Sequence, residues 1–514
     1  MVSGNTPIIV GVGEVINKEP GLSHAVEPAE LILRAIRRSL EDASISEPDL
    51  QAIDSISIVP PWTWPYPDLP ALLAEKLRIN PTHTVTGYHG GNQPAELCDE
   101  AARRIATGQS KMAIIAGGEA LASLSQFQKA GQMPPPNWSK PDPNVKPMSV
   151  SDLSRLGQNA GIRHSMGLPI HIYPMYENAF RAHERQTQQE NHRESAELYA
   201  SFEEIACRRP LSWRYGEAPR DAKEIGTVTK KNRMICTPYP LLMNAFNAVN
   251  QAAACILTSV EHAGSLGIPR DQWIYVLGGA GISDSDNVWE RSNFYSSPSL
   301  EQSLDAGLAA SGLPLEDIDC FDFYSCFPIV PKLACKHLGL SVTKPEKPIS
   351  LLGGLTSGGP GNNYSMHAII EMSHQLRKGT YRNGLVLANG GCVTHHHTIV
   401  LSSQPRQGSL IYPSENPLSA YVDNSSAPPI DEQAEGPASI ETYTVEYDRQ
   451  GRPLRAYIIG TFDDSGHRFV ANHCDDSTLK KLVDPDLEPV GLGGFVHKSK
   501  DERNLFHFKS GSRL

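Results

Sequence analysis

The segment that decides the fold reads Gly353-Gly354-Leu355-Thr356-Ser357-Gly358-Gly359-Pro360-Gly361-Asn362-Asn363-Tyr364-Ser365-Met366-His367. Its five glycines indicate a backbone that turns sharply and comes close to another group, because a Cβ would block both the sharp turn and the close approach. Apolar residues then follow a helical period from 365 to 378, which predicts a helix that begins where the loop ends. The unpaired N–H groups of such a helix start can bind an anion or a polarised carbonyl. We therefore expect a site here, with Gly358, Gly359, Asn362 and Asn363 in its oxyanion-binding loop.

Two further segments of the same half also place polar residues after predicted strands. Residues 318–328 read Ile-Asp-Cys-Phe-Asp-Phe-Tyr-Ser-Cys-Phe-Pro, an alternating strand followed by Tyr324, Cys326 and a helix that begins at Pro328. Residues 384–392 read Gly-Leu-Val-Leu-Ala-Asn-Gly-Gly-Cys, a buried strand that ends in two glycines and Cys392. Three loops at strand ends in one half of the chain are typical of an α/β active site.

The order of these three segments resembles the C-terminal half of the thiolase superfamily, and most closely the sterol-carrier-type thiolases and the type 1 thiolase-like proteins. The resemblance spans most of residues 7–405. It implies an α/β thiolase-like fold of two βαβαβ halves in five layers, with an inserted loop domain and a small β-barrel-like domain at the C-terminus.

Patterns along the chain divide it into five parts. Strands and helices alternate in residues 1–121, which together with 241–265 form the predicted first half. A proline-rich stretch at 122–240 interrupts the alternation, and the resemblance implies that it is the loop domain that receives coenzyme A. The alternation resumes in 266–405. Residues 406–437 read as a linker, and 438–510 as short strands of a small barrel or sandwich.

Composition excludes several classes of function. The formal net charge of −11 argues against a nucleic-acid or anionic-membrane partner, and no apolar run is long enough to span a membrane. The nine cysteines are scattered without a CxxC pair, so the pattern predicts reduced intracellular thiols and neither a disulfide framework nor a metal site. The N-terminus lacks the charged and apolar regions of a signal peptide.

A local excess of positive charge lies in the predicted loop domain. Its candidates for binding the phosphates of coenzyme A are Arg209, Arg214, Lys231 and Arg233. A solvated basic face explains the same residues equally well, so both interpretations stay open.

The resemblance also shows which catalytic groups are missing. A thiolase splits acyl transfer into two steps through a thioester, which needs a nucleophilic cysteine, a histidine in the Gly-rich loop and a second cysteine. Gly91, which Asn92 follows, stands at the position of the nucleophilic cysteine. Gly359 stands at that of the histidine, and Ala388 or its neighbour at that of the second cysteine. We therefore expect acetoacetyl-CoA thiolysis at background level.

Polar groups nevertheless remain at the predicted site. Tyr324 and His367 are the acid/base candidates, and Cys326 and Cys392 are the thiol candidates, with Gly91 and Asn92 beside them on the substrate side. The three histidines at 395–397 lie on a predicted strand, whose alternating faces argue against a shared metal.

Three functions follow from these observations. The first is an acyltransferase or an enzyme that forms or cleaves carbon–carbon bonds in acyl-CoA-type thioesters, with coenzyme A as substrate and no covalently bound cofactor. The second is a protein that binds coenzyme A or acyl lipids without catalysis, and the third is a retro-aldol lyase half that needs a partner. We expect a monomer or homodimer. Ser512-Arg513-Leu514 resembles a peroxisomal address read by the import receptor; without it the location would be cytoplasmic.

Overall fold

The computed structural model describes residues 3–145, 159–406 and 411–509. The tripeptide Ser512-Arg513-Leu514 lies outside these ranges, so the peroxisomal location stays a prediction. Within them, no helix is long and apolar enough to cross a membrane.

The first half of the core is a five-stranded sheet with the order β3-β2-β4-β7-β1. Strand β7 runs antiparallel to both of its neighbours, and β2 runs parallel to β3 and β4. The elements of this half are β1 (Pro7–Ile16), α1 (Pro28–Asp42), β2 (Ser55–Val59), α2 (Leu69–Leu77), β3 (His83–Thr86), α3 (Gln93–Ala106), β4 (Met112–Ala120), β7 (Asn250–Ser259) and α9 (Val260–Ser265).

The second half repeats this arrangement with the strand order β8-β11-β10-β9, in which β11 runs antiparallel to both neighbours. Its elements are β8 (Ile274–Ser283), α10 (Pro298–Ser311), β9 (Cys320–Phe323), α11 (Ile329–Leu338), α12 (Tyr364–Arg377), β10 (Asn383–Gly390) and β11 (His395–Ser402). The halves join where β1 pairs with β8. The nine strands therefore form one sheet built from a duplicated unit.

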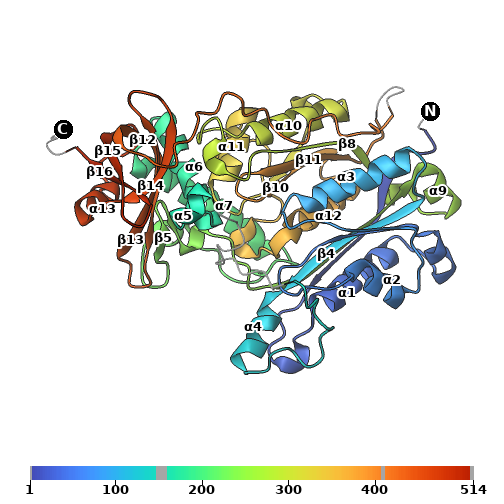
Figure 1. Cartoon of the computed structure of the whole chain (residues 1–514). Coiled ribbons are helices and arrows are strands. Elements are labelled where there is room, and N and C mark those ends of the chain that lie inside the picture. The colour runs from blue at the N-terminus through green and yellow to red at the C-terminus, as the bar shows by residue number, and fades with distance from the viewer. Residues whose placement is uncertain (1–2, 146–158, 407–410, 510–514) are drawn as a thin grey trace.

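Helices α3 and α12 lie side by side between the two half-sheets and contact strands of both (Figure 1). Helices α1 and α2 pack on strands of the first half, and α10 and α11 pack on strands of the second. Apolar residues of α1 such as Leu31, Ile32 and Ile36 are fully buried. This layering confirms the predicted thiolase-like α/β fold.

The inserted region packs on the C-terminal domain as well as on the core. Helix α6 contacts β12, and Cys236 of β5 pairs with Glu446 of β12. The described elements of this region are α4 (Leu121–Lys129), α5 (Ala160–Arg163), α6 (Pro169–His183), α7 (Gln188–Arg208), α8 (Ala222–Gly226), β5 (Met234–Cys236) and β6 (Tyr239–Pro240). The predicted insertion, 122–240, ends with β6, and its strands β5 and β6 extend the sheet of the barrel.

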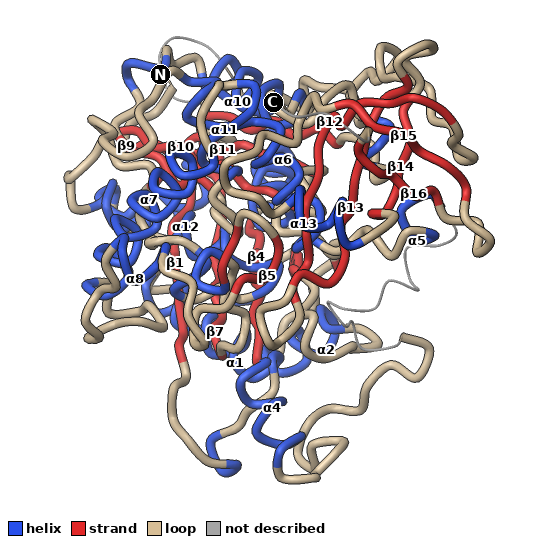
Figure 2. Tube along the Cα trace, turned by 90° about the vertical axis from the view of Figure 1, so that its left-hand side faces the viewer, coloured by secondary structure: helices blue, strands red, loops and turns tan. Residues whose placement is uncertain are grey.

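The C-terminal domain is a closed five-stranded barrel with a separate apolar core (Figure 2). Around it β12 pairs with β13, β13 with β14, β14 with β16, β16 with β15, and β15 with β12 again. Its elements are β12 (Gly436–Tyr447), β13 (Pro453–Phe462), β14 (Arg468–His473), α13 (Asp476–Leu482), β15 (Gly493–Lys498) and β16 (Asn504–Phe508). The predicted small barrel is thus confirmed.

Candidate active site

The loops that follow β9 and β10 lie next to each other. The two strands are parallel neighbours, with Phe323 opposite Leu387, and the backbone N–H of Tyr324 donates to the Leu387 carbonyl at 3.0 Å. Neighbouring parallel strands end at one edge of a sheet. Cys326 therefore meets Asn389 of the next strand, whose Nδ2 lies 3.8 Å from the Cys326 sulfur.

Gly91 stands just before α3 and faces Tyr324. A Cβ at Gly91 would lie 2.6 Å from the Tyr324 hydroxyl oxygen and closer still to the Asn389 carbonyl oxygen. The phenol thus fills the space that a side chain at position 91 would need. In this arrangement a side chain at position 91 would collide with both the Tyr324 phenol and the Asn389 carbonyl.

Tyr173 of α6 connects the inserted region to these loops. Its hydroxyl donates to the Gly391 carbonyl at 3.0 Å and accepts from Asn389 Nδ2 at 2.8 Å. Its ring stacks on Phe327, with ring centroids 4.6 Å apart. Tyr173 was not among the residues predicted for the site from the sequence.

Burial keeps the ionisable groups of this cluster protonated. It raises the pKa of Cys326 and of Cys392 to about 12, and the pKa of both Tyr173 and Tyr324 well above its usual range. At neutral pH these thiols and phenols are neutral hydrogen-bond donors. They suit the polarisation of a carbonyl better than nucleophilic attack.

The Gly-rich loop, residues 353–363, is anchored at its start by β9. Asp322 accepts hydrogen bonds from the backbone N–H groups of Leu351 and Leu352, at 2.7 and 3.2 Å. Gly353 then adopts a φ of 81°, and a Cβ there would meet the backbone of α7, including the nitrogen of Ala206 at 2.6 Å. The loop needs glycine here both for its left-handed conformation and for close approach to α7.

The loop is anchored at its other end to the first half of the core. Asn362 Nδ2 donates to the Pro60 carbonyl at 2.9 Å, and Asn363 Nδ2 donates to the Gly117 carbonyl at 2.8 Å. The N–H groups of Gly358 and Gly359 also have carbonyl partners within the protein. Asn92 Nδ2 bonds Tyr88 and Glu96. These predicted oxyanion donors all have protein partners, and their role in binding substrate stays a prediction.

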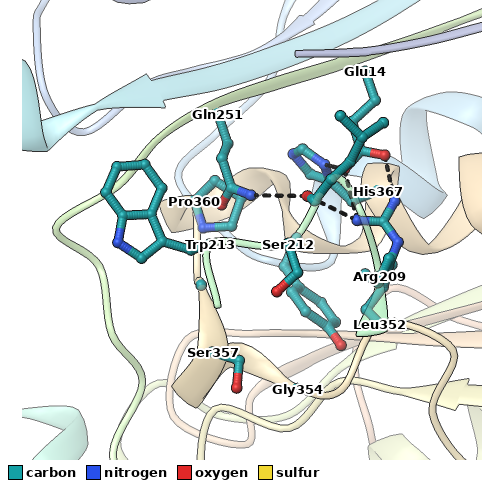
Figure 3. A pocket seen from close by; sticks show the side chains of 13 residues that line it. Glu14, Arg209, Ser212, Trp213, Gln251, Leu352, Gly354, Ser357, Pro360 and His367 are labelled. Atoms are coloured by element: carbon teal, nitrogen blue, oxygen red, sulfur yellow. Dashed lines mark hydrogen bonds and ion pairs between the residues drawn. The ribbon is translucent and has the colours of Figure 1, made fainter. Parts of the chain in front are cut away.

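A buried ion-pair network lies behind the loop (Figure 3). His367 of α12 shares a hydrogen bond of 2.5 Å between its Nδ1 and Oε1 of Glu14, which lies on β1. Arg209 pairs with both oxygens of Glu14, and its Nε donates to Glu371 at 3.0 Å. Burial alone would raise the pKa of Glu14, but Arg209 and His367 lower it to about 2.

The ionised Glu14 determines which nitrogen of His367 carries the proton. A carboxylate can only accept, so Nδ1 donates and Nε2 keeps its lone pair in the neutral ring. Nε2 is buried and has no hydrogen-bond partner within the described ranges. This geometry leaves Nε2 available as a general base.

His367 and Glu14 line a narrow pocket of about 20 Å³, enough for a water molecule. Its wall includes Trp213, Gln251 and Tyr364, and the Oε1 of Gln251 is buried without a partner among the described residues. The Tyr364 ring packs edge-on against Tyr324, with centroids 5.4 Å apart. The pocket and the Tyr324 cluster are therefore separated by a single aromatic ring.

The predicted phosphate-binding residues have different surroundings. Arg209 is committed to Glu14 and Glu371, and Arg214 to Glu203 and Glu217. Lys231 is exposed, and Arg233 donates to the Met234 carbonyl at 3.3 Å. Of these four residues, Lys231 alone is exposed, and the other three are half-buried.

The three histidines at 395–397 have three different partners. They contact Ser283, Ser299 and Asp99 respectively, each within 2.9 Å. This matches the alternating faces expected of a strand.

Sequence reasoning missed Glu14 and Asn389. Glu14 had one local signal, a charged residue inside an otherwise apolar strand. Asn389 had none, because its partners Tyr173 and Cys326 come from distant parts of the chain.

Comparisons with known proteins agree with the overall fold and with the C-terminal domain. Residues 417–502 match the family model "Thiolase-like protein type 1 additional C-terminal domain". The crystal structure of a monomeric SCP2-thiolase-like protein type 1 from Mycobacterium smegmatis is 30% identical, with a TM-score of 0.80, and the match covers 99% of this chain and 100% of that one. No curated protein matches the chain.

More distant structures share the fold alone. An Ltp2–ChsH2 aldolase is 18% identical with a TM-score of 0.57, over 78% of this chain and 98% of that one. Human mitochondrial 3-ketoacyl-CoA thiolase, solved in complex with CoA, is 14% identical with a TM-score of 0.55, over 78% of this chain and 99% of that one.

Proposed function

The chain belongs to the type 1 SCP2-thiolase-like proteins, and we propose that it makes or breaks a carbon–carbon bond in an acyl thioester of coenzyme A without forming an acyl-cysteine. The observation that carries the proposal is the Tyr324 phenol, which fills the space of a side chain at Gly91. The superfamily's acyl-transfer chemistry needs a thiolate near this point.

The two cysteines of the site, Cys326 and Cys392, do not supply that thiolate. A pKa of about 12 leaves roughly one in 10⁵ of the Cys326 and Cys392 thiols ionised at pH 7. Of the two chemistries predicted from the sequence, these thiols favour carbon–carbon bond chemistry over acyl transfer.

Neutral donors support such a reaction. In the cleavage direction a base removes the proton of the 3-hydroxyl group of a 3-hydroxyacyl thioester. The oxygen forms a carbonyl group at Cβ, the Cα–Cβ bond breaks, and its electron pair forms a thioester enolate. An aldehyde or ketone leaves, and the enolate is protonated at Cα. Tyr324 would donate a hydrogen bond to the thioester oxyanion, and His367 Nε2, oriented by Glu14, would be the base.

Access to these groups requires the Gly-rich loop to move, because the pocket of about 20 Å³ holds no thioester as it stands. The pocket wall includes Trp213, which lies against Gly358 of the loop, and Ser357, which belongs to the loop. Lys231 is the exposed cation proposed to meet the phosphates of coenzyme A.

The experiment is product analysis with a panel of 3-hydroxyacyl-CoA and 3-ketoacyl-CoA substrates. From the 3-hydroxyacyl-CoA substrates we expect a shortened acyl-CoA together with an aldehyde or ketone. The 3-ketoacyl-CoA substrates should stay uncleaved, with acetoacetyl-CoA thiolysis at background. Thiolysis at the rate of an ordinary thiolase would refute the proposal. Binding of coenzyme A without any product would favour the non-catalytic binding protein instead.

A further inference from the structure

Cys474, His497 and His507 meet on the surface of the C-terminal barrel, outside the candidate active site. One sulfur and one ring nitrogen from each histidine all lie within 4.8 Å of one another. The Cys474 sulfur is 4.0 Å from His497 Nε2, and the two imidazole rings meet edge to face with centroids 5.7 Å apart.

The barrel register explains why these side chains converge. His497 and His507 are diagonal neighbours across the β15–β16 pair, on one face of the sheet. Val496 and Phe506 alternate with them and are fully buried in the barrel core, so both histidines point outward. Cys474 follows β14 and is held beside β16 by its N–H bond to the Phe506 carbonyl at 2.9 Å.

One ring nitrogen of His507 lacks a partner among the described residues. Nδ1 of His507 is buried from solvent and has no hydrogen-bond partner in the ranges that the structure describes. A buried polar atom left unpaired costs free energy that a bound metal ion would recover. Asp475 lies next to Cys474 in the chain and adds a negative charge to this end of the barrel.

We propose that Cys474, His497 and His507 bind one Zn²⁺ ion, with water in the fourth position. A thiolate and two imidazoles form a donor set that suits zinc. Tetrahedral zinc holds such ligands roughly 3.4–3.7 Å apart, so side-chain shifts of about 1 Å close the cluster. The ion ties the end of β14 to β15 and β16.

The sequence predicted no metal site, because motifs such as a CxxC pair show only ligands that lie close together in the chain. Here the ligands come from the end of β14 and from β15 and β16, and the parallel β14–β16 and antiparallel β15–β16 pairings bring them together.

The test uses the full chain, purified without a histidine tag and stripped with chelator. After dialysis against ZnSO₄ we expect about one zinc per chain by elemental mass spectrometry. Cys474→Ser and His497→Gln should each weaken zinc binding at least tenfold. His467→Gln is the matched control, because His467 lies on the same domain, is half-buried like His497 and His507, and is not part of the cluster.

A labelling experiment avoids dependence on variants. Cys474 is partly exposed, whereas all other cysteines except Cys392 are buried. In the wild-type chain, zinc should slow maleimide labelling of Cys474 at least tenfold, as read by peptide mass. Equal labelling with and without zinc, substoichiometric zinc, or variants that bind zinc as tightly as wild type would each overturn the site.

Discussion

Glu14 and Glu119 are both buried carboxylates on strands of the first half-sheet, and their pKa values move in opposite directions. Burial is the largest influence on each and favours the neutral acid. Arg209 and His367 nevertheless lower the pKa of Glu14 to about 2. Glu119 has only hydroxyl and backbone partners, from Thr63 and Trp62, and its pKa rises to about 7. Of these two carboxylates, only Glu14 is a fixed negative charge that can orient an imidazole at neutral pH.

Glu14 should therefore make stability depend on acid pH. Its pKa is lower in the folded state than its ordinary 4.5, so its contribution is complete above pH 4.5 and is lost as pH falls towards 2. The shift corresponds to about 3 kcal/mol. In urea unfolding, the gap in free energy between wild type and Glu14→Gln should narrow between pH 5 and pH 3. Exposed Glu41→Gln serves as the control, and a constant Glu14→Gln gap would contradict the ion-pair assignment.

Tyr324→Phe tests the proposed oxyanion donor. The change removes one oxygen and leaves the ring packed against Tyr364, so thermal stability and binding of coenzyme A should stay almost unchanged. Turnover of the true substrate should fall about 100-fold or more, the usual cost of losing one such donor. Full turnover in Tyr324→Phe, measured by product release, would remove the tyrosine from the mechanism.

The Gly-rich loop and the helix after it were predicted at the level of elements. The expected helix at 365–378 is α12 (Tyr364–Arg377), and the expected strand at 318–323 is β9 (Cys320–Phe323). Local patterns carry this information because glycines and a helical period are read within one segment. What the loop packs against was not predicted, because α7 and β9 reach it from elsewhere in the chain.

Alanine substitutions at two glycines of similar conformation distinguish the cost of lost packing from the cost of backbone strain. Gly353 and Gly379 have φ angles of 81° and 70°, but only Gly353 has backbone atoms of α7 where a Cβ would be. Gly379→Ala should cost about 1 kcal/mol for the left-handed backbone alone. Gly353→Ala should cost clearly more and also weaken binding of coenzyme A, as measured by thermal unfolding and calorimetry. Equal losses of stability in the two variants would show that the loop does not need its contact with α7.

At the scale of the whole molecule, the duplicated core and the small barrel were predictable, and the contacts between them were not. The alternation of strand and helix in both halves predicted the α/β class of the core. The short strands of the last domain predicted the small barrel. The pairing of Cys236 with Glu446, and of Glu14 with His367, 353 residues away, has no local signal. The candidate site followed the same rule: Tyr324 and Cys326 were found from a motif, whereas Glu14 and Asn389 gained their roles through long-range contacts.

We expect thioester chemistry in this protein to proceed without an acylated cysteine. The most direct test mixes the protein with an acyl-CoA that it is shown to convert and quenches the reaction at short times. The intact mass of the protein is then measured, and the products are analysed in parallel. We expect product to form while the protein mass stays unchanged throughout the reaction. A transient mass gain of one acyl group that disappears in Cys326→Ala would contradict this expectation, because that result would show a covalent mechanism through Cys326.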